Sequence, residues 1–215
     1  MSLVRVHNFS VSLDGFSAGA DQSPEAPFGH AGQRLVRWFT GTRSFHVMTG
    51  QEGGSTGIDD AFASNWGPGI GAEIMGRNKF GPQRGPWTDE EWKGWWGDDP
   101  PFHCPVYVLT HHPRDPFELE NGNSFHFVTN GIEVAMAEAR EAADDQDVSV
   151  GGGASTLQQA IAAPACLDEV VVHQVPILLG GGERLFDHLA AAAAKVELVD
   201  VVEGAEALHL TYRFS

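Results

Sequence analysis

A run of three glycines stands between a β-type segment, Val148–Val150, and a helical pattern over residues 154–164. The first amides of a helix have no partners within it and carry partial positive charge. Because glycine has no side chain, an anion can approach such amides closely. The arrangement predicts a site for the pyrophosphate of a dinucleotide. Gly151, Gly152 and Gly153 would cradle the phosphates, and Ser155 and Thr156 would add hydroxyl donors or cap the helix.

The glycine run has a second interpretation, which is a tight turn from strand to helix without a ligand. It also differs from the G-x-G-x-x-G fingerprint of Rossmann domains. Ser155 or Thr156 stands where the third glycine would be, and the run lies late in the chain. We therefore expect a dinucleotide site on a different architecture.

Two further segments carry groups that suit a phosphate. In IMGRNKFG, residues 74–81, Gly76 and Arg77 follow a short strand, and a guanidinium is a fixed cation that pairs well with phosphate oxygens. Another strand ends in Thr110 and His111, with Arg114 close behind, and such strand ends bind ligands in open α/β sheets. These donors favour NADP(H) over NAD(H). The alternative for Arg77 is a surface ion pair with an acidic residue.

A metal site is not expected. His103 and Cys104 precede a six-residue strand, and His111 and His112 follow it, so about 20 Å separates the two pairs at ~3.3 Å per residue. The cysteines, Cys104 and Cys166, are too few for a disulfide framework and are expected as buried free thiols.

Hydrophobic periodicity predicts the elements that position these residues. Strands are expected at 3–11, 72–77, 105–110, 124–129 and 148–150, one or two strands within 167–180, and an antiparallel hairpin over 195–215. Helices are expected at 34–39, 58–66, 131–143 and 154–164, with a short helix or helical turn at 183–194. Loops are expected at 20–33 and 40–57, the latter a flexible loop or an irregular hairpin, and at 81–101, a tryptophan-rich loop.

The interleaving of strands and helices predicts one α/β domain with a mixed sheet, parallel in its centre and antiparallel at the C-terminal edge. The chain has 215 residues and a formal charge of −16, which opposes nucleic-acid binding. It lacks the long apolar run of a membrane span, and no signal peptide is visible at the N-terminus, so a cytoplasmic location is expected.

With these residues assembled, the sequence resembles the dihydrofolate reductase-like superfamily. It is most similar to the branch of the C-terminal reductase domain of the bacterial riboflavin-biosynthesis deaminase-reductase. The resemblance runs through VSLDGFSAG at 11–19, IMGRNKF, and VGGGASTLQQAI. Its most specific part is LDEVVVHQVPILLGGGERLF at 167–186, with a second glycine triplet.

The resemblance implies a three-layer fold with an eight- or nine-stranded mixed sheet, NADPH as hydride donor, a small-molecule substrate and a homodimer. Arg77 would then hold the 2′-phosphate with Thr110 and His111 nearby. The pyrophosphate would be held, and the nicotinamide ribose flanked, by Val150, Gly151, Gly152, Gly153, Ala154, Ser155 and Thr156. Ser12 and Asp14 would lie near the nicotinamide and the substrate, with Asp14 as a candidate proton donor, water being the other proton source. The alternative for Asp14 is a turn residue before Gly15.

The sequence departs from true dihydrofolate reductases, which place an acidic residue on the first helix. Here the matching positions, around Arg34 and Leu35, carry no carboxylate, which argues against folate reduction. The predicted activity is NADPH-dependent reduction of a pterin-like, ribosylaminopyrimidine-like or carbonyl-type substrate. The alternative is a non-catalytic nucleotide-binding module on the same fold. The tryptophan-rich loop and the segment VVVHQVPILL are the expected dimer surfaces.

Overall fold

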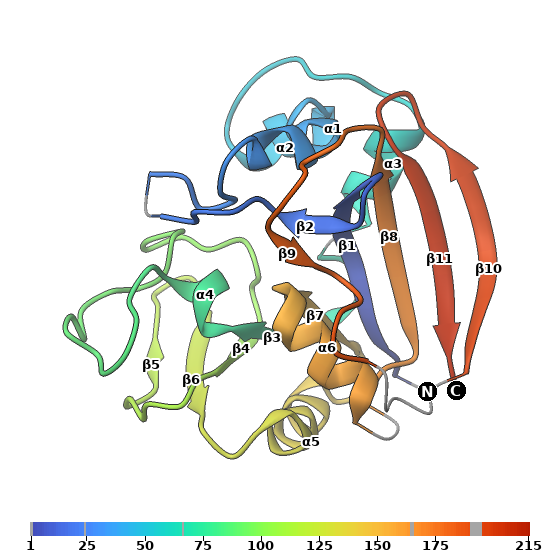
Figure 1. Ribbon diagram of the computed structural model, residues 1–215. Coiled ribbons are helices and arrows are strands. Elements are labelled where there is room, and N and C mark those ends of the chain that lie inside the picture. Colours follow the sequence, from blue (N-terminus) through green and yellow to red (C-terminus); the bar gives the residue numbers. More distant parts are fainter. Residues whose placement is uncertain (1, 24, 66, 164–165, 190–194) are drawn as a thin grey trace.

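The computed structural model of the protein describes residues 2–23, 25–65, 67–163, 166–189 and 195–215. Within these residues a nine-stranded sheet has the order β10-β11-β8-β1-β7-β3-β4-β6-β5, and β2 and β9 form a separate ribbon (Figure 1). The strands are β1 Val4–Ser12, β2 Phe16–Ala18, β3 Ile70–Gly76, β4 Pro105–Leu109, β5 Phe117–Glu118, β6 Ser124–Val128, β7 Asp147–Gly152, β8 Glu169–Val175, β9 Glu183–Arg184, β10 Val196–Glu203 and β11 Leu208–Phe214.

The centre of the sheet is parallel, as the sequence predicts. Six strands run in one direction, from β8 at one side through β1, β7, β3 and β4 to β6. The hairpin β10–β11 joins β8 antiparallel at one edge, and the two-residue strand β5 joins β6 antiparallel at the other. The mixed sheet and the C-terminal hairpin are therefore confirmed.

Helices cover both faces of the sheet and make three layers. They are a 3₁₀ helix η1 Gly32–Leu35, α1 Arg37–Thr40, α2 Arg43–Met48, α3 Ile58–Ser64, α4 Arg77–Phe80, α5 Ile132–Ala143 and α6 Ala154–Ala162. The largest core cluster joins β1, β7 and β8 to α5 and α6. Helix α5 buries its residues at helical spacing, mostly alanines, so it packs close to the strands.

The opposite face carries a second core cluster under the tryptophan-rich loop. Trp87, Trp92 and Trp96 are half-buried and pack against Phe80, Val106 and Phe125. Three of its tryptophans therefore belong to the folded core, whereas Trp95 is 37% exposed.

Two sequence-based element predictions are wrong in part. Segment 40–57 contains the helix α2, which begins because the Thr42 hydroxyl accepts a hydrogen bond from the Phe45 amide at 3.2 Å. In 183–189 there is no helix. Strand β9 pairs with β2, and Gln158 donates to the carbonyl oxygens of Arg184 and Leu185, so this backbone takes its partners from elsewhere in the chain. The remaining part of that prediction, 190–194, lies outside the described residues, as do the predicted helix ends at Trp66 and Pro164.

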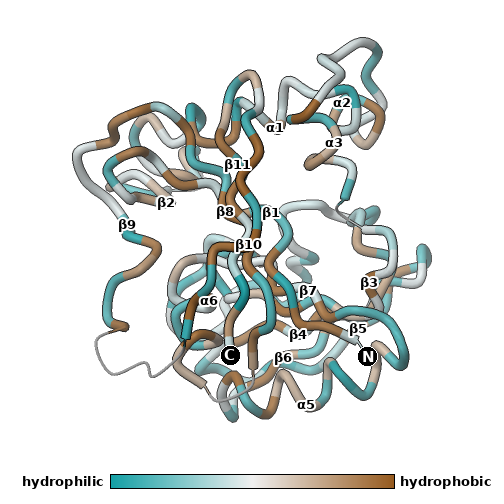
Figure 2. Tube along the Cα trace, turned by 90° about the vertical axis from the view of Figure 1, so that its right-hand side faces the viewer, coloured by the Kyte–Doolittle hydropathy of each residue, from teal (hydrophilic) through white to brown (hydrophobic). Residues whose placement is uncertain are grey.

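One expected dimer surface, the segment VVVHQVPILL, is largely buried within the sheet, while its later part around Leu178, 64% exposed, is open. Strand β8 holds most of the segment VVVHQVPILL, and it lies inside the sheet between β1 and β11, with Val170 fully buried. Exposed apolar side chains instead mark the edge strand β10, which faces the viewer in Figure 2; they are Val196, Leu198, Val199 and Val201. The homodimer itself remains a prediction. No helix among the described residues is long and apolar enough to cross a membrane.

Candidate active site

The parting of two central strands creates the main cavity. Among the described residues, β1 pairs with β7 only at Val4 and Arg5. Beyond that point β1 follows β8 as far as Ser12, whereas β7 follows β3 as far as Gly152. A cavity of about 580 Å³ opens at the gap, toward the carboxyl ends of the parallel strands. This is the position at which open α/β sheets bind ligands.

The cavity has a polar inner wall and an apolar outer wall. The inner wall comes from β1, β7 and the start of α6; it comprises His7, Asn8, Phe9, Ser10, Ser149, Val150, Gly151, Gly153 and Ala154. The outer wall comes from the first helices and the tryptophan-rich loop; it comprises Leu35, Val36, Phe39, Phe45, Met48, Trp95, Trp96 and Phe102. An apolar chamber with a few polar groups on one side suits a flat heterocycle.

Two residues of the glycine run, Gly151 and Gly153, lie on this wall. A Cβ on Gly151 would stand 1.9 Å from Glu73 Oε1 and 2.2 Å from Lys79 Nζ, because the ion pair of these two residues packs beneath it. The Cβ of a residue at 152 would meet the ring of Phe9 at 2.8 Å. At Gly153, no described atom lies within 4 Å of that position. The first two glycines thus admit neighbouring side chains, and the third leaves open space at the start of α6.

The first turn of α6 is not capped by a side chain. Ser155 is exposed and Thr156 is buried, so neither caps the helix as the sequence suggested. The hydroxyl of Thr156 instead packs against Gly76, and a Cβ added at this glycine would stand 2.5 Å from Thr156 Oγ1. This close approach brings the Gly76–Arg77 turn beside the helix start.

A cationic cluster follows that turn. The Arg77 guanidinium lies 3.7 Å above the centre of the Trp87 ring, and that of Arg114 lies 5.2 Å from the same centre. Nε and Nη2 of Arg77 and Nη1 of Arg114 are buried and have no hydrogen-bond partner among the residues that the structure describes. Burial lowers the pKa of Arg77, and the neighbouring charges of Arg84 and Arg114 lower it further. Unpaired donors and like charges in one place favour an anion.

The other predicted phosphate ligands contribute less. The Thr110 hydroxyl accepts from the His112 amide at 3.1 Å and so closes the turn after β4. His111 is exposed, whereas the His112 carbonyl accepts from Trp87 Nε1 at 2.9 Å. Sequence reading missed Trp87 because nothing local marks one tryptophan of that loop as the partner of two arginines. No group of His, Cys, Asp or Glu suited to a metal occurs in the described ranges.

Ser12 and Asp14 lie outside the cavity lining. The Ser12 hydroxyl donates to Asp14 Oδ1 at 2.6 Å, and the amides of Leu179 and Gly180 donate to the same carboxylate at 3.1 and 2.7 Å. The Ser12 contact, followed by the two amides, lowers the pKa of Asp14 to about 2, although partial desolvation opposes them. Asp14 is therefore an anion at neutral pH, which fits the turn interpretation and not a proton donor.

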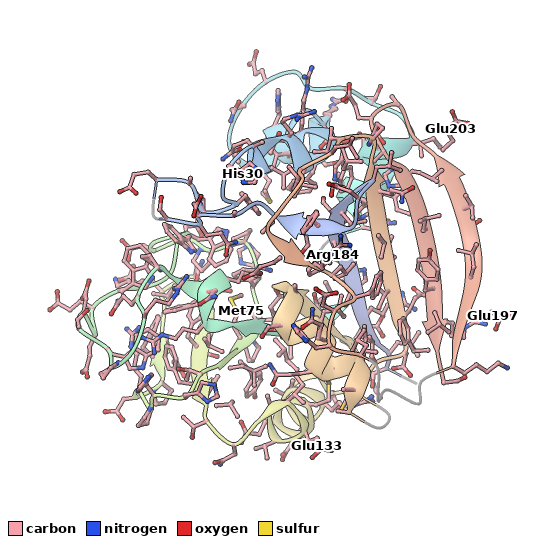
Figure 3. All side chains as sticks on the ribbon, viewed as in Figure 1. His30, Met75, Glu133, Arg184, Glu197 and Glu203 are labelled. Atoms are coloured by element: carbon pink, nitrogen blue, oxygen red, sulfur yellow. The ribbon has the colours of Figure 1, made fainter. Side chains whose placement is uncertain are left out.

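Arg184 continues this structural cluster. Its Nη1 donates to the Asp14 carbonyl at 3.1 Å, and its Cζ lies 4.5 Å from the centre of the Phe16 ring. Figure 3 shows Arg184 on β9, beside β2 and near α6. The segment VSLDGFSAG thus fastens the β2–β9 ribbon over the cavity.

Replacing Asp14 by asparagine should lower the melting temperature at pH 7, because the new NH₂ group would face a main-chain N–H. The pKa of Asp14 in the folded state, about 2, lies below the ordinary 3.8. The ionised carboxylate therefore contributes its full stabilisation of the folded state above about pH 4, and this stabilisation is lost as the pH falls through 2. The difference in melting temperature between wild type and variant, measured by circular dichroism, should therefore become smaller as the pH falls from about 4 to 2. Asp145→Asn, at an exposed carboxylate, is the control; a difference independent of pH contradicts the assignment.

The cavity also contains groups that sequence reading did not identify. The first helices contribute Gln33 and Leu35 but no carboxylate, which agrees with the predicted departure from dihydrofolate reductases. Among the described lining residues the one carboxylate is Glu183, and the one ammonium is Lys79, held 3.0 Å from the buried Glu73. The polar residues of β1 belong to no sequence motif that would have marked them. An irregular register between Val6 and Phe9 turns several of them toward the cavity.

Solved structures share this fold. A protein from Shewanella sp. PV-4, described as a riboflavin biosynthesis protein, is 20% identical with a TM-score of 0.62, covering 100% of this chain and 99% of that one. A dihydrofolate reductase from Enterococcus faecalis, solved with NADP(H), is 14% identical with a TM-score of 0.52, covering 99% and 96%. A deaminase/5-amino-6-(5-phosphoribosylamino)uracil reductase from Thermotoga maritima is 13% identical with a TM-score of 0.51, covering 100% of this chain and 57% of that one.

At these identities the likeness shows the fold, which is the dihydrofolate reductase-like one predicted from the sequence. None of the curated proteins matches the chain by sequence. The profile of one family, described as the RibD C-terminal domain, matches residues 5–210, almost the whole length. The chain therefore belongs to the RibD C-terminal domain family.

Proposed function

We propose that the protein is an NADPH-dependent reductase of a small heterocyclic substrate of the pterin or ribosylaminopyrimidine type. The observation that carries the proposal is the cavity between β1 and β7, which is lined by Gly151, Gly153 and Ala154 at the start of α6. The Gly76–Arg77 turn packs against Thr156 of that helix. Membership of the RibD C-terminal domain family supports an oxidoreductase. A carbonyl-type substrate belongs to the same proposal.

The residues present fit NADPH. Three buried guanidinium nitrogens, Nε and Nη2 of Arg77 and Nη1 of Arg114, have no partner within the described ranges, and such donors suit the dianionic 2′-phosphate. The open space at Gly153 and the uncapped start of α6 suit the pyrophosphate. In a chain with a net charge of −16, such a local cationic cluster is needed to hold a polyanion.

When bound, the reduced nicotinamide supplies a hydride to an acceptor carbon. The chain contributes placement and exclusion of water, which are the usual protein terms in this chemistry. The apolar outer wall, including Phe39 and Trp96, excludes water from a ring lying between the two walls. Because Asp14 is ionised and lies outside the lining, water remains as the proton source.

Binding and turnover are separable in one assay. Trp95 and Trp96 line the cavity, so NADPH and substrate rings should quench tryptophan fluorescence. Oxidation of NADPH, followed at 340 nm with pterins and ribosylaminopyrimidines, then reports reduction. Quenching without oxidation across the panel would favour the nucleotide-binding module, and no quenching by NADPH would refute both functions.

A further inference from the structure

A line of buried polar side chains runs from α3 to the cavity wall. Asp59 Oδ1 lies 2.9 Å from His209 Nε2, and His209 Nδ1 lies 2.7 Å from His173 Nδ1 on the neighbouring strand. His173 Nε2 lies 3.0 Å from Asn8 Oδ1 and 3.2 Å from the His7 carbonyl oxygen, both on β1. Asn8 lines the cavity, so the line ends at the proposed active site.

The line is closed to solvent. His173 and His209 are fully buried, and Asp59 is 6% exposed. The Trp38 ring packs 4.1 Å from the His173 ring, and the Phe62 ring stacks 4.1 Å from that of His209, measured between centroids. Buried polar groups are costly unless each contact joins a donor to an acceptor. The protons along the line follow from that requirement.

Three protons satisfy every contact. Asp59 Oδ2 already accepts from two main-chain amides of the β10–β11 turn, so Oδ1 is an acceptor and His209 carries a proton on Nε2. The His7 carbonyl only accepts, so His173 carries a proton on Nε2. A third proton lies between the two Nδ1 atoms. Two rings with three protons form one imidazolium, and the Asp59 carboxylate balances its charge.

The contact with the Asp59 carboxylate favours placing the positive charge on His209 and not on His173. Burial lowers the pKa of both histidines, and the charge of His209 lowers that of His173 further. At His209, burial outweighs the hydrogen bond and the charge of Asp59, so its pKa stays below the ordinary value, but these two interactions favour His209 over His173 as the protonated ring. His173 thus stays neutral and directs its Nε2–H toward Asn8.

This proton arrangement determines which end of the Asn8 amide faces a ligand. His173 donates to Oδ1, and within the described part of the chain no residue bonds Nδ2. We infer that Asn8 is a specificity-determining residue that donates an Nδ2–H hydrogen bond to a carbonyl oxygen on the substrate ring. The residues Asp59, His209 and His173 act through it as positioning residues that stop the amide from turning over. The inference rests on the proposed function, since the ring is that of its substrate.

Two ring probes test the hydrogen-bond direction. 5,6-Diaminouracil has two ring carbonyls, whereas 2,4,5,6-tetraaminopyrimidine has amino groups at those positions. With NADP⁺ present, the wild-type protein should bind the uracil about tenfold more tightly, the effect of one well-made hydrogen bond. Asn8→Asp, which presents an acceptor of the same shape, should reverse that preference. An unchanged preference in Asn8→Asp overturns the inference.

Variants along the line test the positioning role. His173→Phe keeps a ring but removes the donor to Asn8, so the tenfold preference should vanish while NADP⁺ affinity is unchanged. Asp59→Asn should keep the preference, because its NH₂ can donate to His209 Nε2 and leave Nδ1–H for His173. Phe62→Leu, which loses stacking on His209 but no hydrogen bond, is the packing control. A preference that survives His173→Phe, or is lost equally in Phe62→Leu, contradicts the positioning role.

A spectroscopic measurement stands apart from ligand binding. In protein labelled with ¹⁵N-histidine, His173 Nε2 should be protonated, and one strongly downfield proton should couple to the paired Nδ1 atoms. An unprotonated His173 Nε2 overturns the inference. Failure of NADP⁺ to bind counts against the proposed function, whereas NADP⁺ binding with neither ring bound counts against Asn8 alone.

Discussion

Arg77→Ala should weaken NADPH binding by roughly 100-fold and leave NADH binding nearly unchanged. Hydrogen bonds to a charged group contribute about 1.5–3 kcal/mol each, and the guanidinium presents two unpaired donors to the proposed 2′-phosphate. The Trp87 ring, 3.7 Å from the guanidinium, keeps the donors in place. Fluorescence titration with both nucleotides measures the two affinities.

Two companion variants sharpen this result. Arg77→Lys retains the charge but loses the planar donor pair, so it should lie between wild type and alanine. Arg213→Ala removes an exposed arginine of β11 and should change neither affinity. If Arg77→Ala weakens NADPH and NADH equally, the 2′-phosphate assignment is wrong and the residue has a general structural effect.

Gly153→Ala should leave the free energy of unfolding close to that of the wild type and weaken NADPH binding. No described atom lies within 4 Å of the new methyl group, so the folded chain tolerates it. The methyl would occupy the space proposed for the pyrophosphate. Overpacking of this kind costs about 1–3 kcal/mol, which is a loss of roughly 10- to 100-fold in affinity. Urea unfolding and fluorescence titration on one preparation separate the two effects.

Gly151→Ala is the matched contrast. Its methyl would stand 1.9 Å from Glu73 Oε1 and would push apart the pair with Lys79, and Glu73 is 1% exposed. Disruption of a buried ion pair with overpacking should cost about 3 kcal/mol of unfolding free energy. Equal stability of the two alanine variants would be evidence against the packing described beneath the glycine run.

Local periodicity was sufficient to predict most of the sheet and helices. Alternating apolar residues predicted β11, and helical spacing of buried alanines predicted α5, because each pattern reflects one side of an element meeting the core. The same alternation predicted β10, although its apolar side chains are mostly exposed. Prediction was poorest where the backbone takes its partners from distant segments. Residues 183–184 look helical in isolation, yet they pair with β2 and with the Gln158 side chain.

In the candidate site, too, some residues could be predicted from the sequence, whereas others could be identified only in the folded structure. The glycines and Arg77 were found because a missing side chain and a fixed cation express their chemistry in the sequence itself. The ring partner of Arg77 is Trp87 in the following loop, and two of the donors to Asp14 are the amides of Leu179 and Gly180, more than 160 positions away. The Asp59–His209–His173 line joins α3, β11 and β8 to β1, and its sequence carries no spacing that would reveal it. Such contacts depend on strand order and register, which arise only when the whole sheet has formed.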